Sequence, residues 1–174
     1  SATSNIKILN NDNGFVVGIY SKGNVINDGN ITIHNLGEGT TIGIYADHAI
    51  KNSKITNTGS INITRVNYID DNSTQDDTSD DKSYTAASMT GGTSIGIYAA
   101  SGSTIKNVGT ITISGAQTSY GIYAESGTTV KNSGKIIIDG KSCTGANCTS
   151  TNNAIKLNGG TLFQDGKLLV QNSQ

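Results

Sequence analysis

Residues 96–114 read GIYAASGSTIKNVGTITIS, and residues 121–139 read GIYAESGTTVKNSGKIIID. The two stretches match at most positions and begin 25 residues apart. The same Gly-Ile-Tyr triplet begins at Gly18 and at Gly43, which are also 25 residues apart. A repeat of this length predicts a solenoid, in which each unit contacts only its neighbours. We therefore expect function on the outer faces and in the loops rather than in one internal cleft.

The composition favours β-structure over helix or disorder. The chain of 174 residues has 22 Gly, no Pro and no Trp, and only 34% of its residues are hydrophobic and 14% charged. Isoleucine, valine, threonine and tyrosine favour strands, whereas glycine and asparagine favour tight corners. Disorder usually needs a high net charge, and the formal net charge here is −1. The sequence therefore predicts an all-β fold.

The distribution of charged residues also restricts the classes of binding partner. A nucleic-acid-binding protein needs a basic stripe, and Arg65 is the single arginine of the chain. We therefore expect no nucleic-acid partner. No apolar run approaches the roughly 18 residues that a membrane-spanning helix requires.

Each block reads as three short strands with inward and outward positions. Simple alternation predicts that Ile42 and Ile44 point inward, whereas Gly43 and Tyr45 point outward. The same rule gives Tyr120 an inward position. The third strand of each block carries an inward aliphatic pair, in the order Ile31 and Ile33, Ile61 and Ile63, Ile111 and Ile113, Ile136 and Ile138, Leu168 and Val170. About six stacked coils would form a rod about 30 Å long.

Two ladders of other residue types follow from the repeat. An asparagine precedes the corner glycine by two positions in each block, which predicts a structural ladder of amide hydrogen bonds through Asn27, Asn57, Asn107 and Asn132. The tyrosines of the triplets should form an outward aromatic stripe. This stripe is either stacked surface cover or a contact surface for a partner, since tyrosine is common in interfaces. Its members are Tyr20, Tyr45, Tyr98 and Tyr123.

Two segments interrupt the repeat at the corner between the third strand of one block and the first strand of the next. They are an acidic insertion, residues 66–93, and a cysteine-bearing insertion, residues 139–153. We interpret residues 1–174 as one domain that carries both insertions. Insertions that collect on one face of a repeat protein often mark its binding face.

The acidic insertion contains six aspartates within twelve residues. The spacing is not that of an EF-hand, so we favour a solvated acidic loop that binds a basic partner over a calcium site, and we expect no metal. These candidate partner-binding residues are Asp70, Asp71, Asp76, Asp77, Asp80 and Asp81.

The cysteine-bearing insertion contains Cys143 and Cys148, the two cysteines of the chain. Their close spacing in one loop predicts a local disulfide and an oxidising compartment, with two free thiols as the alternative. A metal site would need two more ligands, and His34 and His48 have no suitable spacing.

Motifs of catalysis are missing from the sequence. There is no His-Glu-x-x-His, no Gly-x-Ser-x-Gly and no P-loop. We therefore expect no enzymatic activity and no cofactor. A β-helical enzyme that acts on polysaccharides is a less favoured alternative.

The Gly-Ile-Tyr-Ala and Asn-x-Gly blocks resemble the passenger repeats of type V bacterial autotransporters, and the clearest copies are residues 96–114 and 121–139. The resemblance implies a right-handed parallel β-helix that is displayed on the bacterial cell surface or secreted. It also implies that the parent chain carries a C-terminal outer-membrane β-barrel.

Passengers of this family suggest the function. The resemblance favours an adhesin or virulence factor that binds a host cell-surface protein or glycan through loops projecting from the β-helix. The alternatives are a released effector that engages a host receptor and triggers signalling, and a structural spacer. Self-association through the open ends of the coil stack is a further expectation, since uncovered sheet edges pair readily.

Overall fold

The computed structural model describes residues 4–10, 13–47, 52–65, 68–70, 82–84, 92–140 and 150–171. All of the strands except β8 (Tyr68–Asp70) and β9 (Lys82–Tyr84) form three parallel sheets. Sheet A contains β1 (Asn5–Asn10), β4 (Asn30–Asn35), β7 (Ser60–Thr64), β12 (Thr110–Ser114), β15 (Lys135–Asp139) and β18 (Lys167–Gln171). Sheet B contains β2 (Val16–Ser21), β5 (Thr40–Ala46), β10 (Thr93–Ala99), β13 (Thr118–Ala124) and β16 (Thr151–Leu157). Sheet C contains β3 (Val25–Asn27), β6 (Lys54–Asn57), β11 (Thr104–Asn107), β14 (Thr128–Asn132) and β17 (Gly160–Gln164).

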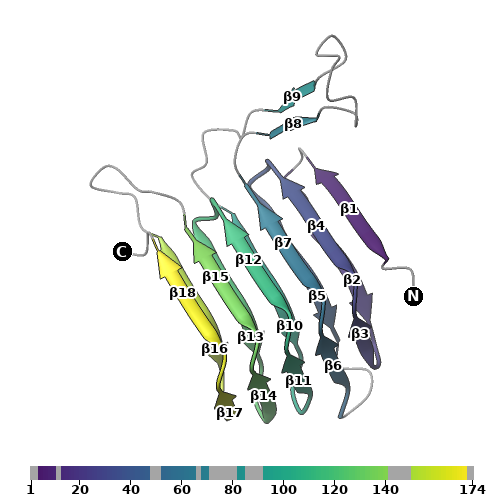
Figure 1. Ribbon diagram of the computed structural model, residues 1–174, viewed down its shortest axis with the longest axis vertical. Helices are drawn as coiled ribbons and strands as arrows, with labels where there is room; N and C mark the ends of the chain where they lie inside the picture. The colour runs from purple at the N-terminus through teal and green to yellow at the C-terminus, as the bar shows by residue number, and fades with distance from the viewer. Residues whose placement is uncertain are drawn as a thin grey trace.

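The chain visits the sheets in a fixed order, from B to C to A, and then begins the next coil. This path gives five complete coils, and β1 is the third strand of a coil before them. Figure 1 shows the strands of sheet A side by side, with the colour passing from purple to yellow across the sheet. The prediction of an all-β, parallel β-helix of about six coils is confirmed. One short antiparallel pair, β8 (Tyr68–Asp70) with β9 (Lys82–Tyr84), lies between β7 and β10.

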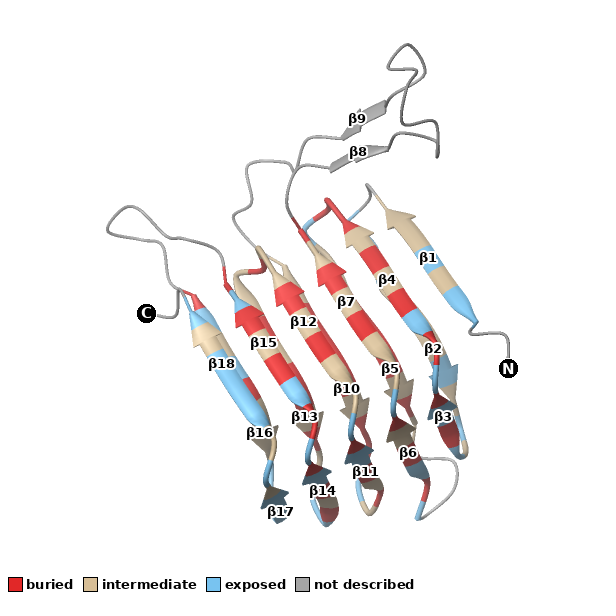
Figure 2. Ribbon diagram, in the orientation of Figure 1, coloured by how far each residue is buried: buried red, intermediate tan, exposed pale blue. Residues whose placement is uncertain are grey.

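The core is a set of aliphatic ladders that run along the solenoid. The inward pairs of the third strands are fully buried from β4 to β15, and isoleucine or valine at Val25, Ile55, Ile105 and Val130 fills the second strands. Figure 2 shows the resulting alternation of buried and less buried residues along the four inner strands of sheet A, β4, β7, β12 and β15. Each ladder position repeats in register, for example Ile61 beside Ile111. The hydrophobic stabilisation of one coil therefore depends on the next coil.

The first strand of each coil departs from simple alternation. A Cβ atom at Gly43 would lie 2.5 Å from Ile61 Cγ2, so this glycine faces the core rather than the solvent. The strand register passes from the pair Ile42–Ile95 to the pair Ile44–Ile97 without pairing the glycines between them. Gly43 and Ile44 are therefore two consecutive inward positions, and the neighbouring strands share this break in alternation, because they stay paired residue for residue on either side of it.

This break in alternation reverses the side of the strand residues that precede the glycine. Val16 packs against the core, whereas Val17 does not, and Thr41 is fully buried on the inward side. The predictions that Tyr120 points inward and that Gly43 points outward are therefore wrong. Ile42 is buried, with 3% of its surface exposed, but it is not part of the central aliphatic cluster. The ring of Tyr120 instead lies on the outer face, with its centroid 5.2 Å from that of Tyr123.

The predicted asparagine ladder is present where sheet C turns towards sheet A. Asn27 donates to Asn57, Asn57 donates to Asn107, and Asn107 donates to Asn132, each at 2.7 Å. Asn132 continues the chain by donating to Gln164 at 2.9 Å. The asparagine side chains are almost fully buried, so each amide satisfies its neighbour in a site without water access.

Candidate functional site

The connections from sheet A to sheet B form one corner of the solenoid, which we call the insertion corner. The acidic insertion lies between β7 and β10, and the cysteine-bearing insertion lies between β15 and β16. The equivalent connection between β12 and β13 contains only residues 115–117. Both insertions therefore extend a turn that the fold can make with three residues.

Most of the predicted residues of the insertions lie outside the described residues. These are Asp71, Asp76, Asp77, Asp80 and Asp81, and both Cys143 and Cys148, so the disulfide stays a prediction. Asp70 is the last residue of β8, and only its backbone is described. Among the described residues, no group of three or more His, Cys, Asp or Glu side chains could hold a metal ion.

Arg65 occupies the base of the acidic insertion and is fully buried. Its guanidinium donates to the carbonyls of Gly37 and Gly39 and, at 3.0 Å, to Thr41 Oγ1. It also donates to the Thr93 carbonyl at 3.0 Å and to Ser94 Oγ at 2.9 Å. The first three acceptors belong to one coil and the last two belong to the next. Arg65 therefore joins the two coils at the residue that directly precedes the acidic insertion.

The five hydrogen-bond acceptors of the Arg65 guanidinium are neutral carbonyl and hydroxyl oxygens. Burial lowers the pKa of Arg65 from 12.5 to about 10, which leaves the guanidinium protonated at neutral pH. Five acceptors in a fixed arrangement suit the planar fork of arginine and do not suit the point charge of lysine. This role of Arg65 was not predicted from the sequence. The signal that could have found it is the lone arginine at the junction between a repeat strand and a long insertion.

The four predicted tyrosines form one continuous stack on the outer face of sheet B. The ring centroids are separated by 5.4 Å from Tyr20 to Tyr45, 4.9 Å from Tyr45 to Tyr98, and 5.5 Å from Tyr98 to Tyr123. Lys156 takes the next position in register and places its Nζ 5.0 Å from the Tyr123 ring centroid. The tyrosine stack is most open at its first member, because Tyr20 is 51% exposed.

Carboxylates accept hydrogen bonds from two hydroxyls of the tyrosine stack. Tyr20 donates to Asp47 at 2.6 Å, and Tyr98 donates to Glu125 at 3.3 Å. The hydrogen bond to Asp47 raises the pKa of Tyr20 above its usual value. Burial, followed by the charge of Glu125, raises the pKa of Tyr98 from 10.0 to about 12. Both hydroxyls therefore stay protonated in neutral solution.

The pKa of Tyr98 makes a testable difference at alkaline pH. Its folded-state pKa lies above the unfolded value, so its contribution to stability is complete below pH 10 and is lost as the pH rises towards about 12. We expect the tyrosinate absorbance of the folded chain to show a late step near pH 12 that the Tyr98→Phe variant lacks. A Tyr84→Phe variant is the control. An unchanged late step in Tyr98→Phe would contradict this assignment.

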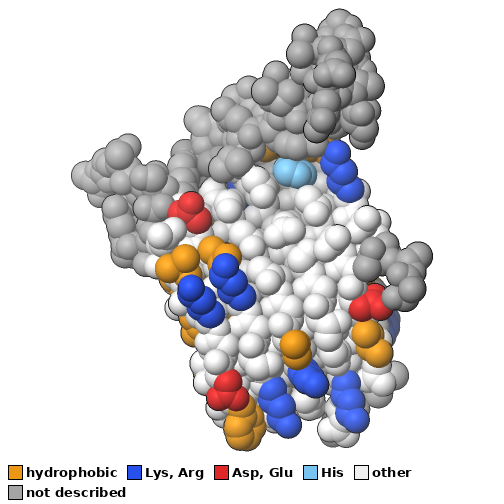
Figure 3. Space-filling model, viewed as in Figure 1, with side chains coloured by type: hydrophobic (Ala, Val, Ile, Leu, Met, Phe, Trp, Pro, Cys, Tyr) orange, Lys and Arg blue, Asp and Glu red, His pale blue; other side chains and the backbone are white. Residues whose placement is uncertain are grey.

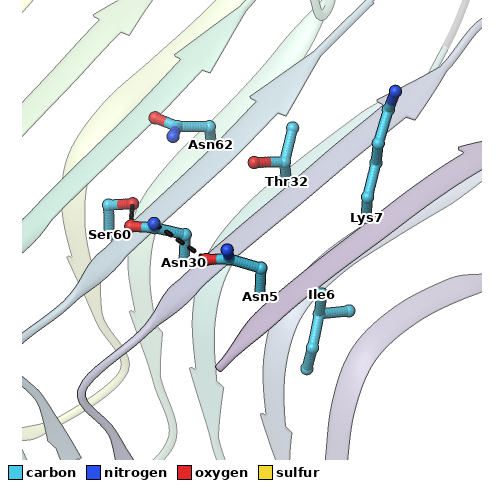
Figure 4. A pocket seen from close by; sticks show the side chains of 7 residues that line it. All are labelled: Asn5, Ile6, Lys7, Asn30, Thr32, Ser60 and Asn62. Atoms are coloured by element: carbon cyan, nitrogen blue, oxygen red, sulfur yellow. Dashed lines mark hydrogen bonds between the residues drawn. The ribbon is translucent and has the colours of Figure 1, made fainter. Parts of the chain in front are cut away.

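The outer face of sheet A is polar and carries little charge over its central strands. Figure 3 shows this face as largely uncharged, with lysines towards its edges. A shallow depression of about 420 Å³ lies over β1, β4 and β7. Figure 4 shows three of its side chains in a row: Ser60 donates to Asn30 at 2.6 Å, and Asn30 donates to Asn5 at 3.0 Å. These groups satisfy one another across strands, which stabilises the sheet.

Comparison with known proteins adds no relative. No family model, curated protein or solved structure matches the chain. The part of the chain that the structure describes contains no helix long and apolar enough to cross a membrane.

Proposed function

We propose that the chain is a β-helical passenger segment of a bacterial autotransporter that binds a host cell-surface protein or glycan through its insertion corner. The observation that carries this proposal is that both long insertions extend the same type of connection, from sheet A to sheet B, on a scaffold whose other coils turn there within a few residues. Loops on a rigid scaffold are common binding elements. The tyrosine stack belongs to sheet B, which begins at this corner, and offers a neighbouring contact surface.

Arg65 supports the same proposal. A buried arginine that joins two coils fixes the position of the residue after which the acidic insertion begins. Fixing the base of a loop lowers the entropy that is lost when the loop binds a partner. The six aspartates of the insertion favour a basic partner surface.

The test replaces each insertion with a turn of the length found at residues 115–117. In the first variant, residues 66–91 are replaced with one alanine, which leaves Arg65 and Gly92 in place. This design follows the register, since Thr64 aligns with Ser114 and Thr93 aligns with Thr118. In the matched second variant, residues 141–149 are replaced with one alanine between Gly140 and Ser150. Binding of each purified chain to cultured host cells is then measured.

We expect the first variant to lose at least tenfold in cell binding while its β-type circular dichroism is kept. Loss in the second variant instead would assign recognition to the cysteine-bearing insertion. Undiminished binding by both variants, or no binding by the parent chain, would contradict the proposal that the insertion corner binds host cells.

A further inference from the structure

Four exposed lysines gather where the last coils turn from sheet C to sheet A, and we call this surface the lysine corner. Lys106 and Lys131 lie on the outer faces of β11 and β14, and Lys135 and Lys167 begin β15 and β18. All four side chains are exposed. Figure 3 shows lysine side chains over β15 and β18 and along the lower edge of the molecule.

The lysines are stacked in register on one another. Lys106 pairs with Lys131, and Lys135 pairs with Lys167. Neighbouring strands of a sheet lie about 4.8 Å apart, and like charges directly opposite each other destabilise the sheet. The fold does not require lysine here, because the preceding coils carry Thr56 beside Lys106 and Thr110 beside Lys135. The sequence therefore keeps two repulsive pairs that neutral residues would remove.

Within the described part of the chain, these four ammonium groups form no ion pairs. The Nζ of Lys131 lies over the Phe163 ring, 5.7 Å from its centroid. The Asp165 carboxylate lines the same depression as Lys106 and Lys131. Six of the 13 acidic residues of the chain lie within residues 70–81, so the remainder has 12 basic and 7 acidic residues, a net charge of +5.

The surface between the lysines is concave and carries an aromatic ring. A depression of about 310 Å³ is lined by Lys106, Lys131, Asn132, Ser133, Phe163 and Asp165. Phe163 is 53% exposed, so its ring is available for contact. Lysine ammonium groups bind anionic substituents. The Phe163 ring can pack on the apolar face of a sugar, and the exposed hydroxyl of Ser133 can form hydrogen bonds with the hydroxyls of that sugar.

We propose that the lysine corner binds a sulfated glycan of the heparin type, laid along the solenoid axis across the last coils. The sulfates pair with the stacked lysines and remove their mutual repulsion, and one sugar ring packs on Phe163. The hollow favours a polymer chain over a flat bilayer surface. Arginine, which suits bidentate phosphate recognition, is absent from the cluster. This site lies at a different corner from the insertions and does not depend on the function proposed for them.

The test measures the affinity of the full chain for heparin over a range of salt concentrations. The double variant Lys131→Gln/Lys135→Gln removes one lysine from each stacked pair. The control Lys22→Gln/Lys54→Gln removes the same charge from exposed lysines outside the lysine corner. We expect at least tenfold weaker binding for the first pair and less than threefold for the control. The slope of log affinity against log salt should fall by about two, as for other polyanions.

Several outcomes would overturn the proposal. These are no binding to heparin, equal losses in both double variants, or equal affinity for hyaluronan, which carries carboxylates and no sulfate. Equal affinity for duplex DNA or for phosphatidylserine vesicles would also overturn it. Replacement of residues 66–91 should leave heparin affinity intact. Loss of heparin affinity in that variant, with none in Lys131→Gln/Lys135→Gln, would place the site elsewhere.

Discussion

The Gly43→Ala substitution is expected to lower the free energy of unfolding by about 3 kcal/mol, as overpacked cores do. A Cβ at this position would lie 2.5 Å from Ile61 Cγ2 and 2.6 Å from the carbonyl oxygen of Gly96 in the next coil. Both neighbours are fixed, one by the core and the other by the strand ladder. The melting temperature should fall by roughly 6 to 12 °C for a chain of this size. Chemical and thermal denaturation followed by circular dichroism would measure both changes.

The matched control is Gly14→Ala. A Cβ at Gly14 would meet no atom within 4 Å, and its backbone does not have a positive φ. We expect this variant to lie within 0.5 kcal/mol of the parent chain, as most surface substitutions do. Equal destabilisation in the two variants would mean that crowding beside the core is not the reason for glycine in the triplet.

The last coil suggests how the close contact between a Cβ at the glycine position and the third-strand isoleucine can be relieved. Ala154 occupies the glycine position there, and the third strand of that coil carries Leu168 where the others carry isoleucine. Leucine has no methyl group on Cβ equivalent to Cγ2. The Gly43→Ala substitution should therefore cost about 1 kcal/mol less in an Ile61→Leu background than in the parent chain, a coupling of the size seen between contacting residues. Additive effects would show that the Gly96 carbonyl causes the whole loss.

The glycine also marks where sequence reasoning failed. The repeat length and the third-strand pattern, such as Ile61 and Ile63, predicted the coils correctly, because in-register ladders repeat the same side chain. Alternation failed at the first strand because Gly43 and Ile44 both face inward, and such a break in alternation leaves no mark in a pattern of apolar residues. Tyr120, which breaks the isoleucine column, was the available clue. An inward tyrosine would bury its hydroxyl without an evident partner.

The candidate site was predictable in part. Insertions can be placed on a corner by counting residues between repeats, and the aromatic stack follows from the shared position of the four tyrosines. The contacts of Arg65 could not be predicted, because Gly37, Gly39 and Thr93 bind through backbone carbonyls that any residue could supply. The stacked lysines were visible in the sequence at Lys106 and Lys131. Their lack of ion pairs depends on which coils lie next to one another.

The second large effect is expected for Arg65→Ala, which should lower the free energy of unfolding by about 4 kcal/mol. The substitution removes donors from three carbonyls and two hydroxyls at a buried corner and leaves a cavity in their place. Hydrogen bonds to charged groups contribute about 1.5 to 3 kcal/mol each, and part of this is offset because burial of the charge is itself costly. Removal of the exposed Lys54 side chain in Lys54→Ala is the control and should have little effect.

Arg65→Lys separates the shape of the guanidinium from its charge. Lysine keeps the positive charge but has three donors on a single nitrogen, so we expect about half of the loss seen in Arg65→Ala. The damage should also be local. Hydrogen exchange should speed up for amides of residues 36–41 and 93–97, which flank the guanidinium, before it does for β14 and β15, because the coils open separately at their weakest junction. A lysine variant as stable as the parent chain, with unchanged exchange at both segments, would mean that the charge alone and not the five-acceptor arrangement joins the two coils.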